Sequence, residues 1–371
     1  MLLMVSLLVL ILLGALFVGF SNGANDNFKG FATVWGSHSL SYRRALVLAT
    51  LATVAGGVAS VFLAHGLVQQ FSGKGLVPGG IVANPSFVAA VAIGAATTVI
   101  AATRIGMPVS TTHALLGALV GASVGLGATS INWSALGDSF VLPLIASPLM
   151  AAILGIAVYS LVTRLRPQAD CACVVEDPQL AQVAAMAAVA GPGLPSLVCG
   201  QTEQCDAMPG VTARPEIPAS LDAVHILSAS AICFARAVND TPKLAALLIA
   251  ASVVSPYGSA VLIAIAMGLG GVLLARRVAE TMSLRISHLD HVQGISANLI
   301  TAGLVIFASR WGLPVSTTHV SVGSISGVGA RARTLDWPAL RPVLLSWVAT
   351  LPFAAAVAWA AALLLDLAAF R

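Results

Sequence analysis

Apolar residues fill ten long stretches of the chain, and short polar segments separate these stretches. The stretches are solidly apolar and lack the alternation of membrane β-strands, and a chain in lipid must satisfy its own backbone hydrogen bonds. Each is long enough to cross a hydrocarbon layer of about 30 Å as a helix. The pattern predicts an all-α polytopic membrane protein, in which re-entrant hairpins could raise the crossings to twelve. The stretches are 2–20 (continuing with polar interruptions to 37), 43–64, 85–103, 106–128, 139–163, 222–250, 256–275, 292–309, 313–330 and 343–366.

The composition supports a location in the cell membrane. Hydrophobic residues make up 58% of the chain and charged residues 9%, whereas soluble domains carry about 25% charged residues. The basic residues are dispersed at segment ends, and no aromatic-interleaved basic stripe indicates a nucleic-acid partner. The lipid bilayer is therefore the expected environment.

The basic residues also predict how the chain is divided and oriented. Most arginines fall on one side if each stretch crosses once, and the positive-inside rule makes that side cytoplasmic. Both termini are then expected outside. We expect a first transmembrane repeat over 1–166, a cytoplasmic, proline-rich linker over 167–220 and a second transmembrane repeat over 221–371.

An internal repeat is the strongest signal in the sequence. Residues 103–121 and 309–327 agree at ten of nineteen positions, including P-V-S-T-T-H in both. A second pattern, N-D-x-x-K, occurs at 25–29 and 239–243, so each half carries an acidic motif followed by a hydroxyl motif. Five segments in each half would make the halves face opposite ways. This predicts two inverted repeats with broken helices at the centre, as in secondary transporters.

The hydroxyl motifs are candidate anion sites. Pro108 and Pro314 are suited to the start of a helix. A helix N-terminus offers free N–H groups and partial positive charge, and hydroxyl donors add to it. Ordinary helix capping is the alternative interpretation. The predicted substrate-binding hydroxyls are those of Ser110, Thr111, Thr112, Ser316, Thr317 and Thr318.

The acidic motifs are candidate cation sites. A carboxylate inside the membrane costs about 2.5–3.5 kcal/mol, so Asp26 and Asp240 are predicted to couple transport to a cation. The neighbouring Gly23 and Pro242 suggest helix breaks there. Substrate-binding roles are also predicted for the side chains beside each acid, Asn25, Lys29, Asn239 and Lys243. Alternatively, each aspartate only pairs with its own lysine.

The histidine and cysteine residues are not expected to bind the substrate or a metal ion. His113 and His319 end the S-T-T-H motifs, where hydrogen-bonded support of the turns is expected. Cys171, Cys173, Cys199 and Cys205 lie in the linker, and their spacing matches no standard zinc motif. The sequence therefore predicts no metal site and no cofactor other than a co-transported proton or sodium ion.

The motifs resemble the PiT family of inorganic phosphate transporters. G-A-N-D at 23–26 and both P-V-S-T-T-H motifs carry the resemblance, over roughly 20–125 and 225–330. The resemblance implies a cation-coupled symporter with inverted repeats and alternating access, whose anion lies between the S-T-T and N-D turns. In the family motif N-D-V-A-N-A, asparagine stands three residues after the aspartate. Lys29 and Lys243 replace it here, which favours proton over sodium coupling.

The expected function is secondary active symport of inorganic phosphate, driven by a proton or sodium gradient. A permease for sulfate or a related tetrahedral oxyanion is the alternative, because the family includes sulfate permeases. An ion channel belongs to another class, but paired intramembrane carboxylates favour a carrier. An enzyme is not expected, since neither a G-x-S-x-G elbow nor an H-E-x-x-H motif is present. The resemblance is also compatible with a homodimer.

Overall fold

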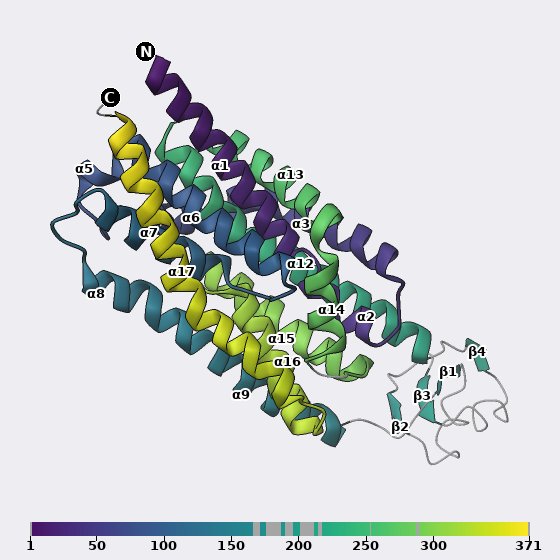
Figure 1. Cartoon of the computed structure of the whole chain (residues 1–371). Helices are drawn as coiled ribbons and strands as arrows, with labels where there is room; N and C mark the ends of the chain where they lie inside the picture. Colours follow the sequence, from purple (N-terminus) through teal and green to yellow (C-terminus); the bar gives the residue numbers. More distant parts are fainter. Residues whose placement is uncertain are drawn as a thin grey trace.

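The ten apolar stretches form the helical body of the molecule. The computed structural model describes residues 2–165, 171–175, 187–189, 196–200, 211–213, 217–252, 254–286 and 289–369. Figure 1 shows the arrangement of the elements. The first half contains α1 (Leu2–Asp26), η1 (Lys29–Phe31), α2 (Ala32–Gly36), α3 (Tyr42–Leu63), α4 (His65–Phe71), α5 (Gly79–Val82), α6 (Pro85–Arg104), α7 (Thr111–Gly125), α8 (Trp133–Leu136), the π-helical η2 (Gly137–Val141) and α9 (Leu142–Leu165). The second half contains α12 (Ile217–Ala250), α13 (Pro256–Leu274), α14 (Arg276–Leu284), α15 (His291–Arg310), α16 (Thr317–Ala332) and α17 (Trp337–Ala369).

Eight helical segments of the described chain are long and apolar enough to cross a membrane, and they confirm the prediction of a helical membrane fold. Two of the ten predicted crossings are wrong. The stretches 106–128 and 313–330 become helical only at Thr111 and Thr317, so α7 and α16 have 15 and 16 residues. Helices of this length rise only about 23 Å, short of the hydrocarbon layer. Both therefore begin inside the molecule.

The turn before each short helix explains where that helix starts. Gly106 and Gly312 occupy the same position in the two repeats, and their φ angles are 75° and 68°. This left-handed conformation is easy only for glycine, and it ends the preceding helix α6 or α15. The proline two residues later lacks a backbone N–H and lies two residues before the serine N-cap, so it is part of the turn and the serine begins the new helix.

The predicted helix breaks at Gly23 and Pro242 are not found. Helix α1 continues through Gly23 and ends at Asp26, followed by a short turn and η1. Helix α12 runs for 34 residues straight through Pro242. At the acidic motif, the helix is therefore interrupted only in the first half, after Asp26. In the second half α12 continues, because neighbouring helices can accommodate a proline within a membrane helix.

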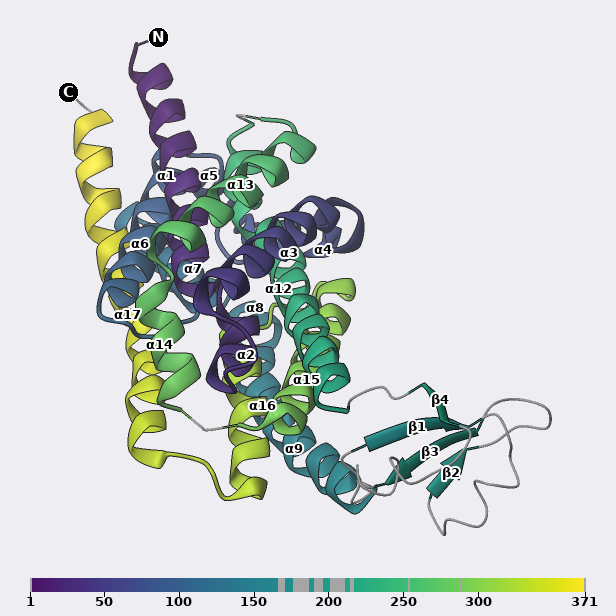
Figure 2. The ribbon, with the colours of Figure 1, turned by 90° about the vertical axis from the view of Figure 1, so that its right-hand side faces the viewer.

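Corresponding helices of the two halves make corresponding contacts, and several of these contacts join one half to the other. Helix α1 contacts α13 and α6, while α12 contacts α3 and α15. Helix α7 packs on α17, and α16 packs on α9. Figures 1 and 2 show that α9 and α17 run in opposite directions, as do α1 and α12. Two repeats inserted with opposite orientations would produce this arrangement.

The linker and the termini lie at opposite ends of the helical body (Figure 1). In the linker, β1 (Cys171–Val175), β2 (Ala187–Val189), β3 (Ser196–Gly200) and β4 (Val211–Ala213) form an antiparallel sheet of order β2-β3-β1-β4. The sequence did not predict this sheet. Cys171, Cys173 and Cys199 lie in its strands, whereas Cys205 lies outside the described residues.

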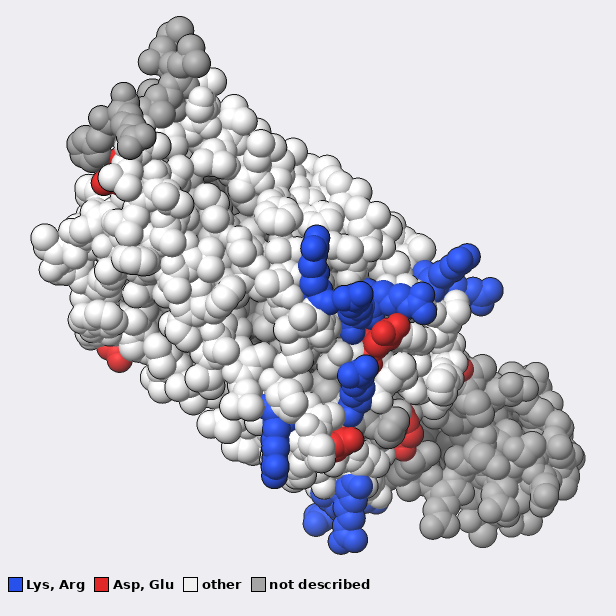
Figure 3. Space-filling view, in the orientation of Figure 1, with Lys and Arg blue, Asp and Glu red and all other residues white. Residues whose placement is uncertain are grey.

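Basic side chains gather toward the linker end of the face drawn in Figure 3, and none is seen at the end with the termini. The exposed arginines of the described chain include Arg43, Arg44, Arg276, Arg277 and Arg331. The distribution agrees with the charge asymmetry from which the cytoplasmic side was predicted.

Glycine pairs allow the short helices to approach their neighbours closely. A Cβ atom on Gly117 or Gly121 of α7 would lie 2.2 or 2.0 Å from a backbone oxygen of α17. A Cβ on Gly323 or Gly327 of α16 would lie 2.5 or 2.1 Å from a backbone oxygen of α9. These small residues let helix backbones touch in a membrane, where the hydrophobic effect does not drive helix association.

Substitution of one of these glycines should therefore destabilise the fold. We expect Gly327→Ala to lower stability by about 1–3 kcal/mol, because the new methyl group must displace the backbone of α9. Thermal unfolding of the detergent-solubilised protein measures this. The control is Gly303→Ala on α15, where nothing lies within 4 Å of the added Cβ. Equal unfolding temperatures for the two variants would contradict the interpretation.

Candidate functional site

The acidic and hydroxyl motifs of both halves meet in one buried cluster. The side-chain amide of Asn22 donates to Asp26 Oδ2 and Asp240 Oδ2, each at 3.2 Å. The same nitrogen lies 3.0 Å from Thr111 Oγ1. Thr317 Oγ1 lies 3.5 Å from Asp240 Oδ2. One amide thus joins the two carboxylates and the start of α7, and the start of α16 reaches the carboxylate of Asp240 directly.

The two lysines cross from one half to the other. Lys29 Nζ donates to Asp26 Oδ1 at 2.5 Å in its own half and to Thr318 Oγ1 at the start of α16. Lys243 Nζ lies 3.4 Å from Asp240 Oδ1 in its own half and 2.9 Å from Thr112 Oγ1 at the start of α7. The lysines therefore pair with their own aspartates and also connect the repeats.

The backbone before each short helix completes these contacts. Lys29 Nζ is 3.2 Å from the carbonyl of Val109, and Thr318 Oγ1 donates to the same carbonyl at 2.8 Å. Lys243 Nζ is 2.7 Å from the carbonyl of Val315, to which Thr112 Oγ1 donates at 3.3 Å. The two half-sites are thus equivalent, and each uses residues from both halves of the chain.

The two asparagines hold the turns in place. Asn25 donates to Thr103 Oγ1 and to the carbonyl of Met107, each at 3.0 Å, and its Oδ1 accepts from the N–H of Val109 at 3.1 Å. These contacts tie the end of α1 to the turn between α6 and α7, so the amide orients the start of α7.

Asn239 has the matching position in the second half. It donates to the carbonyl of Val315 at 3.3 Å and to Asp240 Oδ1 at 3.1 Å, and it accepts from Ser309 Oγ at 3.1 Å. The predicted substrate-binding asparagines therefore already use their amides to position the two turns.

Ser110 and Ser316 are the N-caps of the two short helices. Their side-chain oxygens accept from the backbone N–H of His113 at 3.1 Å and of His319 at 3.3 Å. The capping interpretation thus describes the serine oxygens, whereas the threonines that follow contact the Asn22 amide, the Asp240 carboxylate and the two ammonium groups. Each serine and threonine of the two motifs is at most 5% exposed, so the cluster is closed to the surface in this conformation.

Asn22 and Arg236 are parts of the site that the sequence interpretation missed. Arg236 Nη1 donates to Asn22 Oδ1, and Arg236 Nη2 donates to Thr53 Oγ1, both at 2.9 Å. Each residue precedes its aspartate by four positions, which places it on the same face of its helix. The available signal was a single arginine inside the apolar stretch 222–250. Such a residue marks a functional position by default.

All buried aspartate, glutamate, lysine and arginine side chains of the described chain belong to this cluster. They are Asp26, Lys29, Arg236, Asp240 and Lys243. With the acids ionised and the bases protonated, three cations face two carboxylates, and one positive charge is in excess. Since an uncompensated charge is costly inside a membrane, the cluster is prepared to receive an anion.

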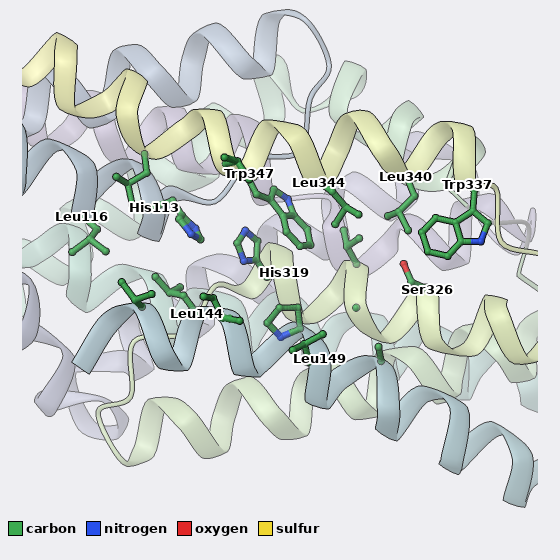
Figure 4. Close-up of a pocket in the computed structure, with 18 residues that line it drawn as sticks. His113, Leu116, Leu144, Leu149, His319, Ser326, Trp337, Leu340, Leu344 and Trp347 are labelled. Atoms are coloured by element: carbon green, nitrogen blue, oxygen red, sulfur yellow. The ribbon is translucent and has the colours of Figure 1, made fainter. Parts of the chain in front are cut away.

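The histidines of the repeated motif lie outside the cluster. Their rings face each other at 4.5 Å, and the ring of His319 stacks on Trp347 at 3.7 Å. Both line an apolar cavity of about 620 Å³ between α7, α9, α16 and α17 (Figure 4). His113 Nδ1 and His319 Nε2 are buried without a hydrogen-bond partner. The histidines thus pack together, and their expected hydrogen-bonded support of the turns is not seen at these atoms.

The cavity offers an anion few polar partners, and the described chain has no cluster of metal-ligating histidine, cysteine and acidic side chains. The cavity's walls are mainly leucine, valine, isoleucine and tryptophan side chains. A phosphate ion would lose its hydration there without gaining donors. Groups of three or more histidine, cysteine or acidic side chains able to hold a metal ion are not found among the described residues. The charged cluster is therefore the candidate site.

Helices that span a bilayer around a buried cluster of charges and hydroxyls define a multi-pass integral membrane transport protein of the cell membrane. Comparison with known families agrees, because residues 22–358 match the phosphate transporter family. The chain therefore belongs to the phosphate transporter family, as the repeated motifs predicted.

Similar proteins support this assignment. The chain is 28% identical to a Bacillus subtilis (strain 168) protein described as a low-affinity inorganic phosphate transporter, over 94% of both chains. It is also 28% identical to a phosphate permease of Haemophilus influenzae, over 91% of both. A solved structure described as the sodium-dependent phosphate transporter has a TM-score of 0.77 and 22% identity, covering 98% of this chain and 99% of that one. The last comparison shows the shared fold.

The cluster makes a prediction about stability. We expect Lys29→Met to destabilise the protein by about 3–5 kcal/mol, because Asp26 then remains buried without its cation. Adding Asp26→Asn should recover at least about half of that loss, since the unpaired charge is removed. Unfolding in detergent measures both changes.

The exposed ion pair Arg276–Glu280 provides the matched control. Its Nε to Oε1 distance is 3.1 Å, with side chains 73% and 40% exposed. Arg276→Met should change stability by no more than about 1 kcal/mol. If Lys29→Met were as mild as this control, the lysine could not be compensating a buried carboxylate.

Proposed function

We propose that the chain is a secondary active carrier that moves inorganic phosphate across the membrane, coupled to a proton or sodium gradient. One observation carries the proposal: the N-termini of α7 and α16 and the aspartates of α1 and α12 converge on one buried cluster with an excess positive charge. The family description and the names of the relatives support phosphate as the substrate.

The anion is proposed to lie between the two short helices. Their N-termini supply backbone N–H groups and partial positive charge, and the hydroxyls of Thr111, Thr112, Thr317 and Thr318 supply further donors. Lys29 and Lys243 already bond two of these hydroxyls. A bound phosphate would accept donors from threonines and lysines together.

Alternating access is proposed to open the cluster to each side in turn. The contacts Lys29–Thr318, Lys243–Thr112 and Asn22–Asp240 all join one half to the other. A movement of one repeat against the other would break and re-form them, which is the usual way that a site between repeats is exposed. Asp26 and Asp240 are proposed to carry the coupling, with the linker 167–220 on the cytoplasmic side.

A carrier fits the cluster better than an enzyme or a channel. The two half-sites present the same groups to each other, whereas catalysis normally requires a nucleophile, an acid and a base in different roles. The residues of the cluster are buried, whereas a conducting pore needs a continuous path. A sulfate permease remains the second candidate, because sulfate has the same tetrahedral shape.

Uptake of labelled phosphate into proteoliposomes tests the proposal. Wild-type protein should give saturable uptake. Asp26→Asn or Asp240→Asn should lower it by roughly 30-fold or more, as expected when a partner in a buried charge cluster is lost. Asp138→Asn, on an exposed segment, is the matched control and should transport normally. Undiminished uptake by both cluster variants would remove the proposed coupling role.

Competition between anions separates the two substrates. Phosphate in its protonated forms can donate hydrogen bonds to the carboxylates, whereas sulfate cannot. Excess unlabelled sulfate should therefore lower phosphate uptake by less than about twofold, since a site with buried acceptors rejects an analogue without the donor. Stronger inhibition by sulfate than by phosphate would support the sulfate permease.

A further inference from the structure

The ammonium groups of the cluster occupy positions that resemble cation sites. Lys29 Nζ lies near four oxygen atoms, those of Asp26 Oδ1, Asn25 Oδ1, Thr318 Oγ1 and the carbonyl of Val109. Carboxylate, amide, hydroxyl and carbonyl oxygens are also the ligands of hard metal cations. An ammonium group has three donors, so these acceptors use all of them.

The second half repeats the arrangement. Lys243 Nζ lies near Asp240 Oδ1 at 3.4 Å, Thr112 Oγ1 at 2.9 Å and the Val315 carbonyl at 2.7 Å. A metal ion could not enter either group of oxygens while the ammonium remains, because two positive charges would compete for the same ligands. The chain contains three lysines, and two of them are in these positions.

Arg236 adds a cation that has no counterpart in the first half. Its equivalent there is Asn22, with which it shares a hydrogen bond of 2.9 Å. Its nearest carboxylate oxygen, Asp240 Oδ2, is 3.9 Å away, and its Nε is buried without a hydrogen-bond partner. The arginine is 1% exposed. The arginine therefore has a buried N–H donor that an anionic ligand could satisfy.

The charges of the cluster indicate which anion it can bind without an added cation. A site closed inside the membrane is most stable when its charges cancel. Two carboxylates and an anion would normally need added cations. With all five side chains ionised, Lys29, Arg236 and Lys243 exceed the two carboxylates by one positive charge. A monovalent oxyanion alone would neutralise the cluster.

We propose that Lys29, Lys243 and Arg236 take the place of metal cations in the transport cycle, so that this chain moves monovalent phosphate without sodium. The inference rests on the proposed function and narrows it, because sodium is removed and the co-transported proton is the one bound to the monovalent phosphate, which can donate it in a hydrogen bond to a carboxylate. Lys29 and Lys243 hold the two oxygen groups, and Arg236 supplies the charge that the anion balances.

Replacement of external sodium tests the inference in wild-type protein. Phosphate uptake into proteoliposomes is measured under an imposed pH gradient, with sodium, potassium or choline chloride outside. The initial rates should agree within about twofold, because no sodium ion contributes to the loaded state. A rate about tenfold or more higher with sodium would overturn the inference, as it would show a required ligand.

The double variant Lys29→Asn/Lys243→Asn provides the opposite result. Asparagine removes each ammonium and adds an amide oxygen, which leaves the oxygen groups free to bind a metal ion. Sodium should now stimulate uptake by about tenfold or more. Lys74→Asn, on an exposed loop, is the matched control and should remain independent of sodium.

Calorimetric titration with sodium chloride gives a second readout that does not depend on transport. The double variant should release or absorb heat on binding sodium, whereas the wild type and Lys74→Asn should not. A double variant that elutes as a folded protein but neither binds sodium nor responds to it would overturn the inference. Should that variant not fold, the wild-type ion replacement still decides the question.

The outcomes separate this inference from the proposed function. Absence of phosphate uptake in every medium would refute phosphate transport itself. Phosphate uptake that requires sodium in the wild type would leave the proposed function intact and refute only the role of the three side-chain cations.

Discussion

The two buried lysines at the centre of the molecule make the contacts on which the rest of the structure depends, because each pairs with the aspartate of its own half and bonds a threonine of the other half. Five charged side chains are buried together, and inside a membrane each would be costly alone. Lys29 reaches Thr318 in the second half, and Lys243 reaches Thr112 in the first. Neither half can satisfy its own polar groups, so the halves need each other to fold around the cluster.

The short helices α7 and α16 bring their N-termini to the buried lysines and aspartates. A full-length crossing would place backbone hydrogen bonds through the middle of the site. Instead α7 and α16 begin there and leave their first N–H groups free to face an anion. The glycines of these helices pack directly on the backbones of α17 and α9. Close packing thus fixes the position of each helix end, which a binding site requires.

The duplication is not preserved equally at all positions. The lysines, aspartates and threonines keep matching contacts, but Asn22 and Arg236 differ although they occupy equivalent places. That difference gives the cluster its excess positive charge. The repeated histidines lie elsewhere: His113 packs against His319, His319 stacks on Trp347, and both line an apolar cavity outside the cluster.

The sequence by itself determined the membrane class, the helical fold and the repeat. These features rest on local signals: apolar length, missing charge and matched motifs such as P-V-S-T-T-H. It also identified Asp26, Lys29, Asp240 and Lys243 as related positions, because their order recurs in both halves.

Only the tertiary structure decided which groups meet. It placed Lys29 on the opposite repeat's hydroxyl, assigned Ser110 to a helix cap and packed His113 against His319 in place of the expected hydrogen bond to the turn. It also brought Arg236 beside Asn22 across 214 positions of sequence separation. The physical reason is that burial and hydrogen bonding depend on neighbours from distant segments, and a motif records only the residues next to it along the chain.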